Sequence, residues 1–140
     1  MREVEIVTVL DSNFLIAVLR GKETPKVTLD MFDNPKTTMI NVFELYFGAM
    51  RSIKSKEVMA ETNSLLKSIE IIDFDRHAAA KAADIHAKLM SSGKTLDVQD
   101  VLIAGIVITN KEELVTMDIN HFNRIPGLKC RSWKRGDYGR

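Results

Sequence analysis

The sequence contains little cysteine and no long apolar run. Cys130 is the one cysteine among 140 residues, so no disulfide forms within the chain. No apolar run reaches the roughly 18 residues that cross a bilayer. Residues 1–5 carry two acidic side chains and lead into an apolar segment, which is unlike a signal peptide. We therefore expect a protein of the reducing cytoplasm without a membrane segment.

An excess of charge of one sign is also missing. The chain has 20 basic and 19 acidic residues, for a formal net charge of +1. A nucleic-acid-binding domain is often strongly basic, so any such contact here must be local. The apolar fraction of 45% and the charged fraction of 28% are those of a soluble globular protein. The length suits one domain, which we expect to span residues 1–140.

Apolar or β-branched segments alternate along the chain with segments of helical periodicity. Strands are expected at residues 4–10, 37–40, 69–74 and 114–116, with an edge strand at 128–131. Helices are expected at residues 14–19, 25–32, 41–50, 58–69, 76–90 and 98–109, and the chain from Asn120 is expected to be turn-like. Such alternation requires crossover connections and hence a parallel sheet. The expected fold class is α/β, a three-layer α/β/α sandwich with a central parallel sheet of four to five strands.

Four acidic residues interrupt otherwise apolar segments, where an unpaired buried carboxylate is costly. Asp11 directly follows the first expected strand, at the sheet edge where open α/β folds bind their ligands. Asp118 lies two residues beyond the fourth strand. Glu44 and Asp100 are each the only charged residue in a long stretch of the chain. Each of these positions needs a physical reason.

Each acid has an ordinary structural explanation when it is taken alone. Asp11 could cap the helix that follows it, and Asp100 could complement the dipole of its own helix. Glu44 could lie on a solvent-facing stripe, and Asp118 could be a turn residue. Asp97 fits the N-cap of the last long helix, where its side chain would accept a backbone N–H. We favour that cap over direct metal binding, and a contact through a metal-bound water is compatible with either.

Taken together, the four acids favour a shared metal site, because a parallel sheet brings its strand ends and the following helices to one edge. Oxygen ligands without a cysteine or histidine cluster select Mg²⁺ or Mn²⁺ over zinc or copper. The three histidines are too scattered along the chain to form a rival site. We predict one or two such cations per site, held by Asp11, Glu44, Asp100 and Asp118.

The acids belong to four short motifs that span nearly the whole chain. The motifs are DSNFLI at 11–16, Glu44-Leu45 with Gly48, Gly93 followed by DVLIA at 100–104, and TMD at 116–118 with Phe122, PGL at 126–128 and Trp133. In this order and spacing the motifs resemble the PIN domain family, and more closely its VapC-type toxin branch. The chain departs from the pattern of that family at Ser12, where threonine is more usual, and at Gly105, and these departures preserve polarity or small size.

The resemblance implies a compact α/β/α fold and a metal-dependent ribonuclease, usually a homodimer, that a small antitoxin restrains. The positions that match the family's catalytic and metal-binding acids are Asp11, Glu44, Asp100 and Asp118. The positions that match residues orienting those acids are Asn13 and Thr116. RNA would be held through its phosphates by basic residues near the acidic edge. The candidates that follow the motifs closely are Arg20, Lys22, Lys94 and Arg124.

The roles of two surfaces are undecided from the sequence, and three alternative functions compete with the toxin. The basic tail around Trp133 could bind a nucleic-acid strand, although such tails are more often solvated. Apolar residues at 42–66 could form a dimer face, an antitoxin groove or plain core. A non-catalytic metal-binding partner and an RNA-processing PIN module without an antitoxin are the alternatives to the toxin. A receiver-type domain would leave Glu44 and Asp100 unexplained.

Overall fold

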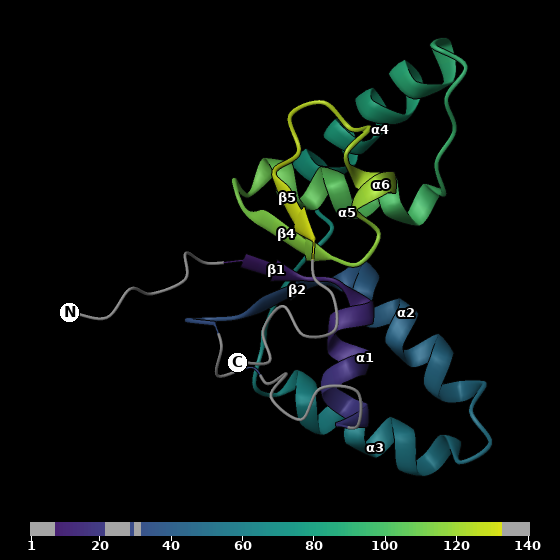
Figure 1. Ribbon diagram of the computed structural model, residues 1–140, viewed down its shortest axis with the longest axis vertical. Coiled ribbons are helices and arrows are strands. Elements are labelled where there is room, and N and C mark those ends of the chain that lie inside the picture. The colour runs from purple at the N-terminus through teal and green to yellow at the C-terminus, as the bar shows by residue number, and fades with distance from the viewer. Residues whose placement is uncertain (1–7, 22–28, 30–31, 133–140) are drawn as a thin grey trace.

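The computed structural model describes residues 8–21, 29 and 32–132, which form a parallel sheet between two layers of helices (Figure 1). The strand order is β3-β2-β1-β4-β5, and every neighbouring pair is parallel. The strands are β1 (Thr8–Leu10), β2 (Lys36–Thr38), β3 (Glu70–Ile72), β4 (Glu113–Thr116) and β5 (Cys130–Ser132). The α/β/α sandwich expected from the sequence is confirmed, with five strands.

The six α-helices of the described residues divide into two groups, one on each face of the sheet. Figure 1 shows the first group in the lower part of the view and the second group in the upper part. The first group is α1 (Ser12–Arg20), α2 (Met39–Met50) and α3 (Ser55–Leu66), and the second is α4 (Arg76–Ser91), α5 (Val98–Thr109) and α6 (Ile119–Phe122). No helix within the described ranges is long and apolar enough to cross a membrane.

Successive residues of the two central strands face opposite helical layers. Leu10 and Val115 pack in the core formed with α1, α2 and α3. Val9 and Leu114 pack in the core formed with α4, α5 and α6. All four are completely buried, at 0% exposure. Burial on both faces explains why these strands read as continuous apolar runs rather than as an alternating pattern.

Local capping signals determine where several helices begin and end. The Asp11 carboxylate accepts a hydrogen bond from Ser12 N, so α1 begins earlier than the expected 14–19. Asp75 caps α4 as expected, accepting from Ala78 N (2.9 Å). Gly21 ends α1 in the left-handed conformation (φ 63°), which glycine adopts without strain.

The structure corrects two expected elements. The strand expected at 37–40 ends at Thr38, because the Thr38 hydroxyl accepts from Asn41 N (3.1 Å) and caps α2. The chain from Asn120, expected to be turn-like, contains most of α6, a single turn too short for apolar periodicity to reveal. Most of the helix expected at 25–32 and the start of the strand expected at 4–10 lie outside the described residues.

Candidate metal centre

The predicted acidic residues gather at the carboxyl-terminal edge of the sheet, beside its two central strands. Asp11 follows β1 and Asp118 follows β4, and these strands are hydrogen-bonded neighbours. The chain moves outward from β1 through β2 to β3, and then continues with β4 and β5 on the other side. The site therefore lies at a switch in strand order, where open α/β sheets form their ligand crevices.

Asp11 is firmly held, with 5% of its surface exposed. Its Oδ1 accepts hydrogen bonds from Ser12 N (2.9 Å) and Asn41 Nδ2 (2.8 Å), and its Oδ2 accepts from Thr116 Oγ1 (2.6 Å). Burial raises the pKa of Asp11, the three donors oppose that rise, and the charge of Asp118 adds to it. The carboxylate thus has one orientation and a crowding like charge, which a cation would relieve.

Thr116 connects the Asp11 and Asp118 positions. Its hydroxyl donates to Asp11 and accepts from Asp118 N (3.0 Å). Asn13 Oδ1 accepts a longer hydrogen bond from Met117 N (3.4 Å). Thr116 therefore lies where the sequence predicts a residue that orients the acids. Asn13 instead contacts the backbone between Thr116 and Asp118, so it acts on the acids less directly than expected.

Glu44 projects from α2 toward Asp11. Its Oε1 accepts from Ser12 Oγ (2.5 Å), and Asn41 Nδ2 lies 3.3 Å from the same oxygen. Burial raises the pKa of Glu44, the Ser12 hydroxyl lowers it, and the charges of Asp11 and Asp100 raise it further. Glu44 therefore shares the electrostatic environment of the other acids.

Asn41 is a site residue that the sequence reasoning missed. It is completely buried (0%), and its amide nitrogen is within hydrogen-bond distance of Asp11, Ser12 and Glu44. Thr38 Oγ1 donates to the amide oxygen (2.8 Å), which fixes the orientation of the amide. Its position one helical turn before Glu44, and so on the same helix face, is the sequence signal that could have identified it.

Asp100 approaches from the first turn of α5. Burial raises the pKa of Asp100 to about 6, with further contributions from the charges of Asp11, Asp97 and Asp118. His121 Nδ1 lies 3.7 Å from Asp100 Oδ2 and lowers that pKa. The sequence reasoning assigned His121 to a loop and missed this contact, because a helix as short as α6 leaves no periodic signal.

Asp97 occupies the N-cap position of α5, as predicted, but its side chain makes no capping hydrogen bond. The expectation that the carboxylate accepts a backbone N–H is therefore wrong. The Asp97 carbonyl accepts from Asp100 N (3.0 Å) instead. A capping carboxylate would lie at that amide, close to the like-charged Asp100 side chain, and the Asp97 charge already raises the pKa of Asp100. Repulsion thus disfavours the cap.

The chemistry of the gathered side chains fits a hard divalent cation, since the acids and their polar neighbours offer oxygen. Within the described ranges, no three Asp, Glu, His or Cys side chains lie close enough to surround one ion. Repulsion explains the spread, because each of three acids has a pKa raised by the charge of another. The residues that we predict a cation would draw together are Asp11, Glu44, Asp100 and Asp118.

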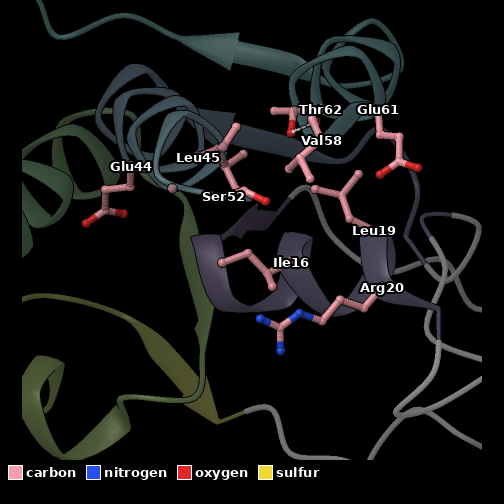
Figure 2. Close-up of a pocket in the computed structure, with 11 residues that line it drawn as sticks. Ile16, Leu19, Arg20, Glu44, Leu45, Ser52, Val58, Glu61 and Thr62 are labelled. Atoms are coloured by element: carbon pink, nitrogen blue, oxygen red, sulfur yellow. Dashed lines mark hydrogen bonds between the residues drawn. The ribbon is translucent and has the colours of Figure 1, made fainter. Parts of the chain in front are cut away.

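A groove of about 460 Å³ lies between α1, α2 and α3 and reaches the site at Glu44 (Figure 2). Arg20 lies along the α1 side of this groove, and Glu61 lies on the α3 side. The apolar side chains of its walls include Ile16, Leu19, Leu45 and Val58. The groove therefore offers an apolar surface with charged residues along it, directly beside the acidic site.

The predicted RNA-binding residues lie in different places. Arg20 lines the groove of Figure 2, whereas Lys94 and Arg124 line one cleft beside α4. Lys22 lies outside the described residues, as does the tail from residue 133 onward. Arg131 Nε lies 3.3 Å from Glu113, so it forms an ion pair within the sheet edge. Of the predicted RNA-binding residues that the structure describes, only Lys94 and Arg124 therefore lie together.

Comparison with known proteins agrees with this architecture. The PIN domain family model matches residues 8–128. The tRNA(fMet)-specific endonuclease VapC of Salmonella typhimurium is 28% identical over 128 residues, which cover 89% of this chain and 96% of that protein. Ribonuclease VapC2 of Haemophilus influenzae is 30% identical over 128 residues, with the same coverage of 89% and 96%.

A solved structure has the same fold. The crystal structure of VapBC2 from Rickettsia felis, bound to a DNA fragment from its promoter, aligns with a TM-score of 0.83 at 24% identity. The alignment covers 92% of this chain and 100% of that one. The family match spans most of the chain and includes all four acids. The chain therefore belongs to the PIN domain family and, within it, to the VapC-type branch.

Proposed function

We propose that the chain is a Mg²⁺- or Mn²⁺-dependent endoribonuclease, acting in the cytoplasm as the toxin of a toxin–antitoxin pair. The observation that carries the proposal is the acidic site, in which Asp11 is oriented by three hydrogen-bond donors beside Glu44, Asp100 and Asp118. The names of the relatives, ribonuclease and endonuclease, support RNA as the substrate.

Each acid has a role that follows from its environment. A bound Mg²⁺ or Mn²⁺ would neutralise charge on the phosphate and favour hydroxide over water. Asp11, Asp100 and Asp118 would bind one or two such cations. Glu44 would orient the attacking water, and its raised pKa makes it a stronger proton acceptor than an exposed glutamate. Thr116 would keep Asp11 in its binding orientation through the 2.6 Å hydrogen bond.

The groove of Figure 2 supports an antitoxin as the protein partner. Its apolar walls suit an amphipathic peptide segment, and Arg20 and Glu61 could select that segment by charge. Because the groove reaches Glu44, a segment bound there would lie against the catalytic acids. Solved structures with a similar fold include a toxin–antitoxin complex from Klebsiella pneumoniae and VapBC-5 from Mycobacterium tuberculosis, a member of the VapBC family of toxin–antitoxin systems.

Exposed apolar side chains on α2 support a homodimer. Phe43 and Phe47 are 55% and 52% exposed and stack at 6.2 Å between ring centroids. Met50 and Ile53 extend this surface at 67% and 102% exposure. Large exposed apolar patches are uncommon on monomers and usually mark contact surfaces. We propose this face of α2 as the dimer contact.

The proposal is tested by cleavage of RNA by purified protein in Mg²⁺ or Mn²⁺. We expect Asp11→Asn and Asp100→Asn each to abolish cleavage, because each removes a charge that binds the cation. EDTA should abolish cleavage by the unaltered protein, because it removes the cation. Circular dichroism should show both variants folded. Cleavage that survives EDTA and both substitutions would contradict the proposal.

The cleavage experiment separates one alternative and the neighbouring reading frame separates another. A non-catalytic partner would bind Mn²⁺ through the acids yet cut no RNA. An RNA-processing PIN module would cut RNA but lack an antitoxin, and its neighbouring reading frame would not encode a small DNA-binding protein. The receiver-type alternative is set aside by the family assignment.

A further inference from the structure

A second cleft, of about 160 Å³, lies against α4, on the face of the sheet opposite the helices that form the groove of Figure 2. Four of its nine lining residues are cationic, and Ile85, Leu89, Ser92 and Pro126 are its uncharged lining residues. The charged residues that line it are Lys81, Asp84, Lys88, Lys94 and Arg124. The chain as a whole is nearly neutral, so a local concentration of positive charge of this kind requires an explanation.

Four positive charges in this cleft meet one negative charge. Asp84 Oδ2 lies 3.2 Å from Lys88 Nζ and 3.8 Å from Lys81 Nζ, so two lysines share one carboxylate. Lys94 and Arg124 have no ion-pair partner among the described residues. Exposed ion pairs contribute little to stability, so the excess charge does not serve the fold. It leaves a positive potential that an anion can use.

Two short segments join the cleft to the acidic site. Lys94 lies in the connection that continues to Asp97 and Asp100, and its N donates to Leu89 O (2.8 Å), which anchors it to the end of α4. Arg124 follows α6, which also carries His121, the neighbour of Asp100. Lys94 and Arg124 thus lie on the two chain segments that continue to Asp100 and to its neighbour His121, so the backbone connects the cleft with the acidic site.

The size of the cleft limits what it can hold. About 160 Å³ is well below the roughly 300–1,000 Å³ of pockets that enclose a whole small molecule. A sugar–phosphate unit of an extended chain requires less enclosure. An acidic site also repels the phosphates that it must bind, so cations beside it are needed to hold a nucleic acid.

We propose that this cleft binds the sugar–phosphate backbone of single-stranded RNA next to the position that is cut. The inference rests on the proposed ribonuclease function and assigns the substrate contact to Lys94 and Arg124, with Lys81 and Lys88 extending it. It divides the flanks of the site between two partners: RNA takes the basic cleft and protein takes the apolar groove. An acidic peptide in the cleft is the competing outcome.

The test measures binding of a fluorescently labelled single-stranded RNA by anisotropy in EDTA, so that a Kd is obtained whether or not the RNA is cut. The double variant Lys94→Gln/Arg124→Gln should weaken binding about tenfold at 0.1 M salt, equally for different RNA sequences. The slope of log Kd against log salt should fall by about 1.4, at about 0.7 per lost phosphate contact. The charge-matched control Lys56→Gln/Lys67→Gln, on the surface near α3, should change neither quantity.

A double variant that weakens RNA binding no more than the control overturns the assignment. So does a double variant that retains RNA binding but no longer binds a labelled poly-glutamate peptide, which would assign the cleft to an acidic protein. Failure of the unaltered protein to cut RNA in Mg²⁺ or Mn²⁺ contradicts the proposed function instead. The EDTA measurement reports on the cleft independently of that result.

Discussion

At the scale of single residues, the site depends on hydrogen bonds that hold Asp11 in one orientation. Asn41 and Thr116 reach it from α2 and β4, and both are completely buried. A buried donor that satisfies a carboxylate is costly to remove, because the remaining oxygen loses its partner without gaining water. The two polar side chains therefore influence cation binding without being predicted ligands.

Replacing Thr116 tests this dependence. Thr116→Val keeps the shape of the side chain but removes the donor to Asp11 and the acceptor for Asp118 N. We expect kcat/KM for RNA to fall about 10- to 100-fold, with more Mg²⁺ needed for half-maximal rate. Thr116→Ser restores the hydroxyl and should recover most of the rate. Equal losses in the two variants would show that packing, rather than the hydrogen bond, is what Thr116 provides.

At the scale of elements, α4 and α5 pack closely where Gly105 of α5 faces the backbone of α4. A Cβ on Gly105 would lie 2.6 Å from Ala78 O and 2.9 Å from Ala82 Cβ. Real Cβ atoms do not approach other atoms so closely, so α5 packs directly on the α4 backbone. Asp100 lies in the first turn of the same α5, and residues of α4 line the basic cleft.

A matched pair of glycine substitutions tests that contact. Gly105→Ala should lower the free energy of unfolding by about 1–3 kcal/mol, because the helices must separate. Gly48→Ala, at an exposed position of α2 with nothing within 4 Å of the added Cβ, should raise it by about 0.5–1 kcal/mol through helix propensity. Urea denaturation in EDTA measures both. A Gly105→Ala protein as stable as the parent would contradict the close packing.

At the scale of the whole molecule, the acidic site is a cost to the metal-free fold. The pKa of Asp100 is raised from 3.8 to about 6, and those of Asp11 and Glu44 are raised as well. A raised carboxyl pKa means that the folded state binds protons more tightly than the unfolded chain. The penalty is therefore fully present above pH 6 and is relieved as the pH falls through 6 toward 4.

Thermal unfolding in EDTA should accordingly show a higher Tm at pH 5.5 than at pH 7.5. Mg²⁺ or Mn²⁺ should raise the Tm more at pH 7.5, where the acids are ionised. A hundredfold excess over Kd should add about 2.7 kcal/mol to the free energy of unfolding. Asp100→Asn should raise the Tm of the metal-free protein at pH 7.5 by a few degrees, while Asp73→Asn, at an exposed acid outside the site, should not. A metal-free Tm that rises from pH 5.5 to 7.5 would refute the expected crowding of charge.

Prediction from sequence succeeded where the signal was local, as at Asp75 and Gly21, which mark the helix ends that were expected of them. It also succeeded for Asp11 and Asp118, which follow strands that are neighbours in the sheet. It failed at Asp97, whose cap position was right but whose side chain makes no capping hydrogen bond, and whose charge raises the pKa of Asp100. The four metal-binding assignments stay predictions until cation binding is measured.

By itself the sequence determined which segments of the chain form strands and which form helices, because periodicity and capping depend on residues a few positions apart. It also determined that acids follow the strands, at the carboxyl-terminal edge of a parallel sheet. Only the tertiary structure decided that the Asn41 amide holds Asp11, 30 positions away, and that His121 faces Asp100. It also decided that Arg20 lines an apolar groove while Lys94 and Arg124 share a basic cleft. These contacts join separate elements, and their geometry depends on how helices pack on the sheet, which no local pattern encodes.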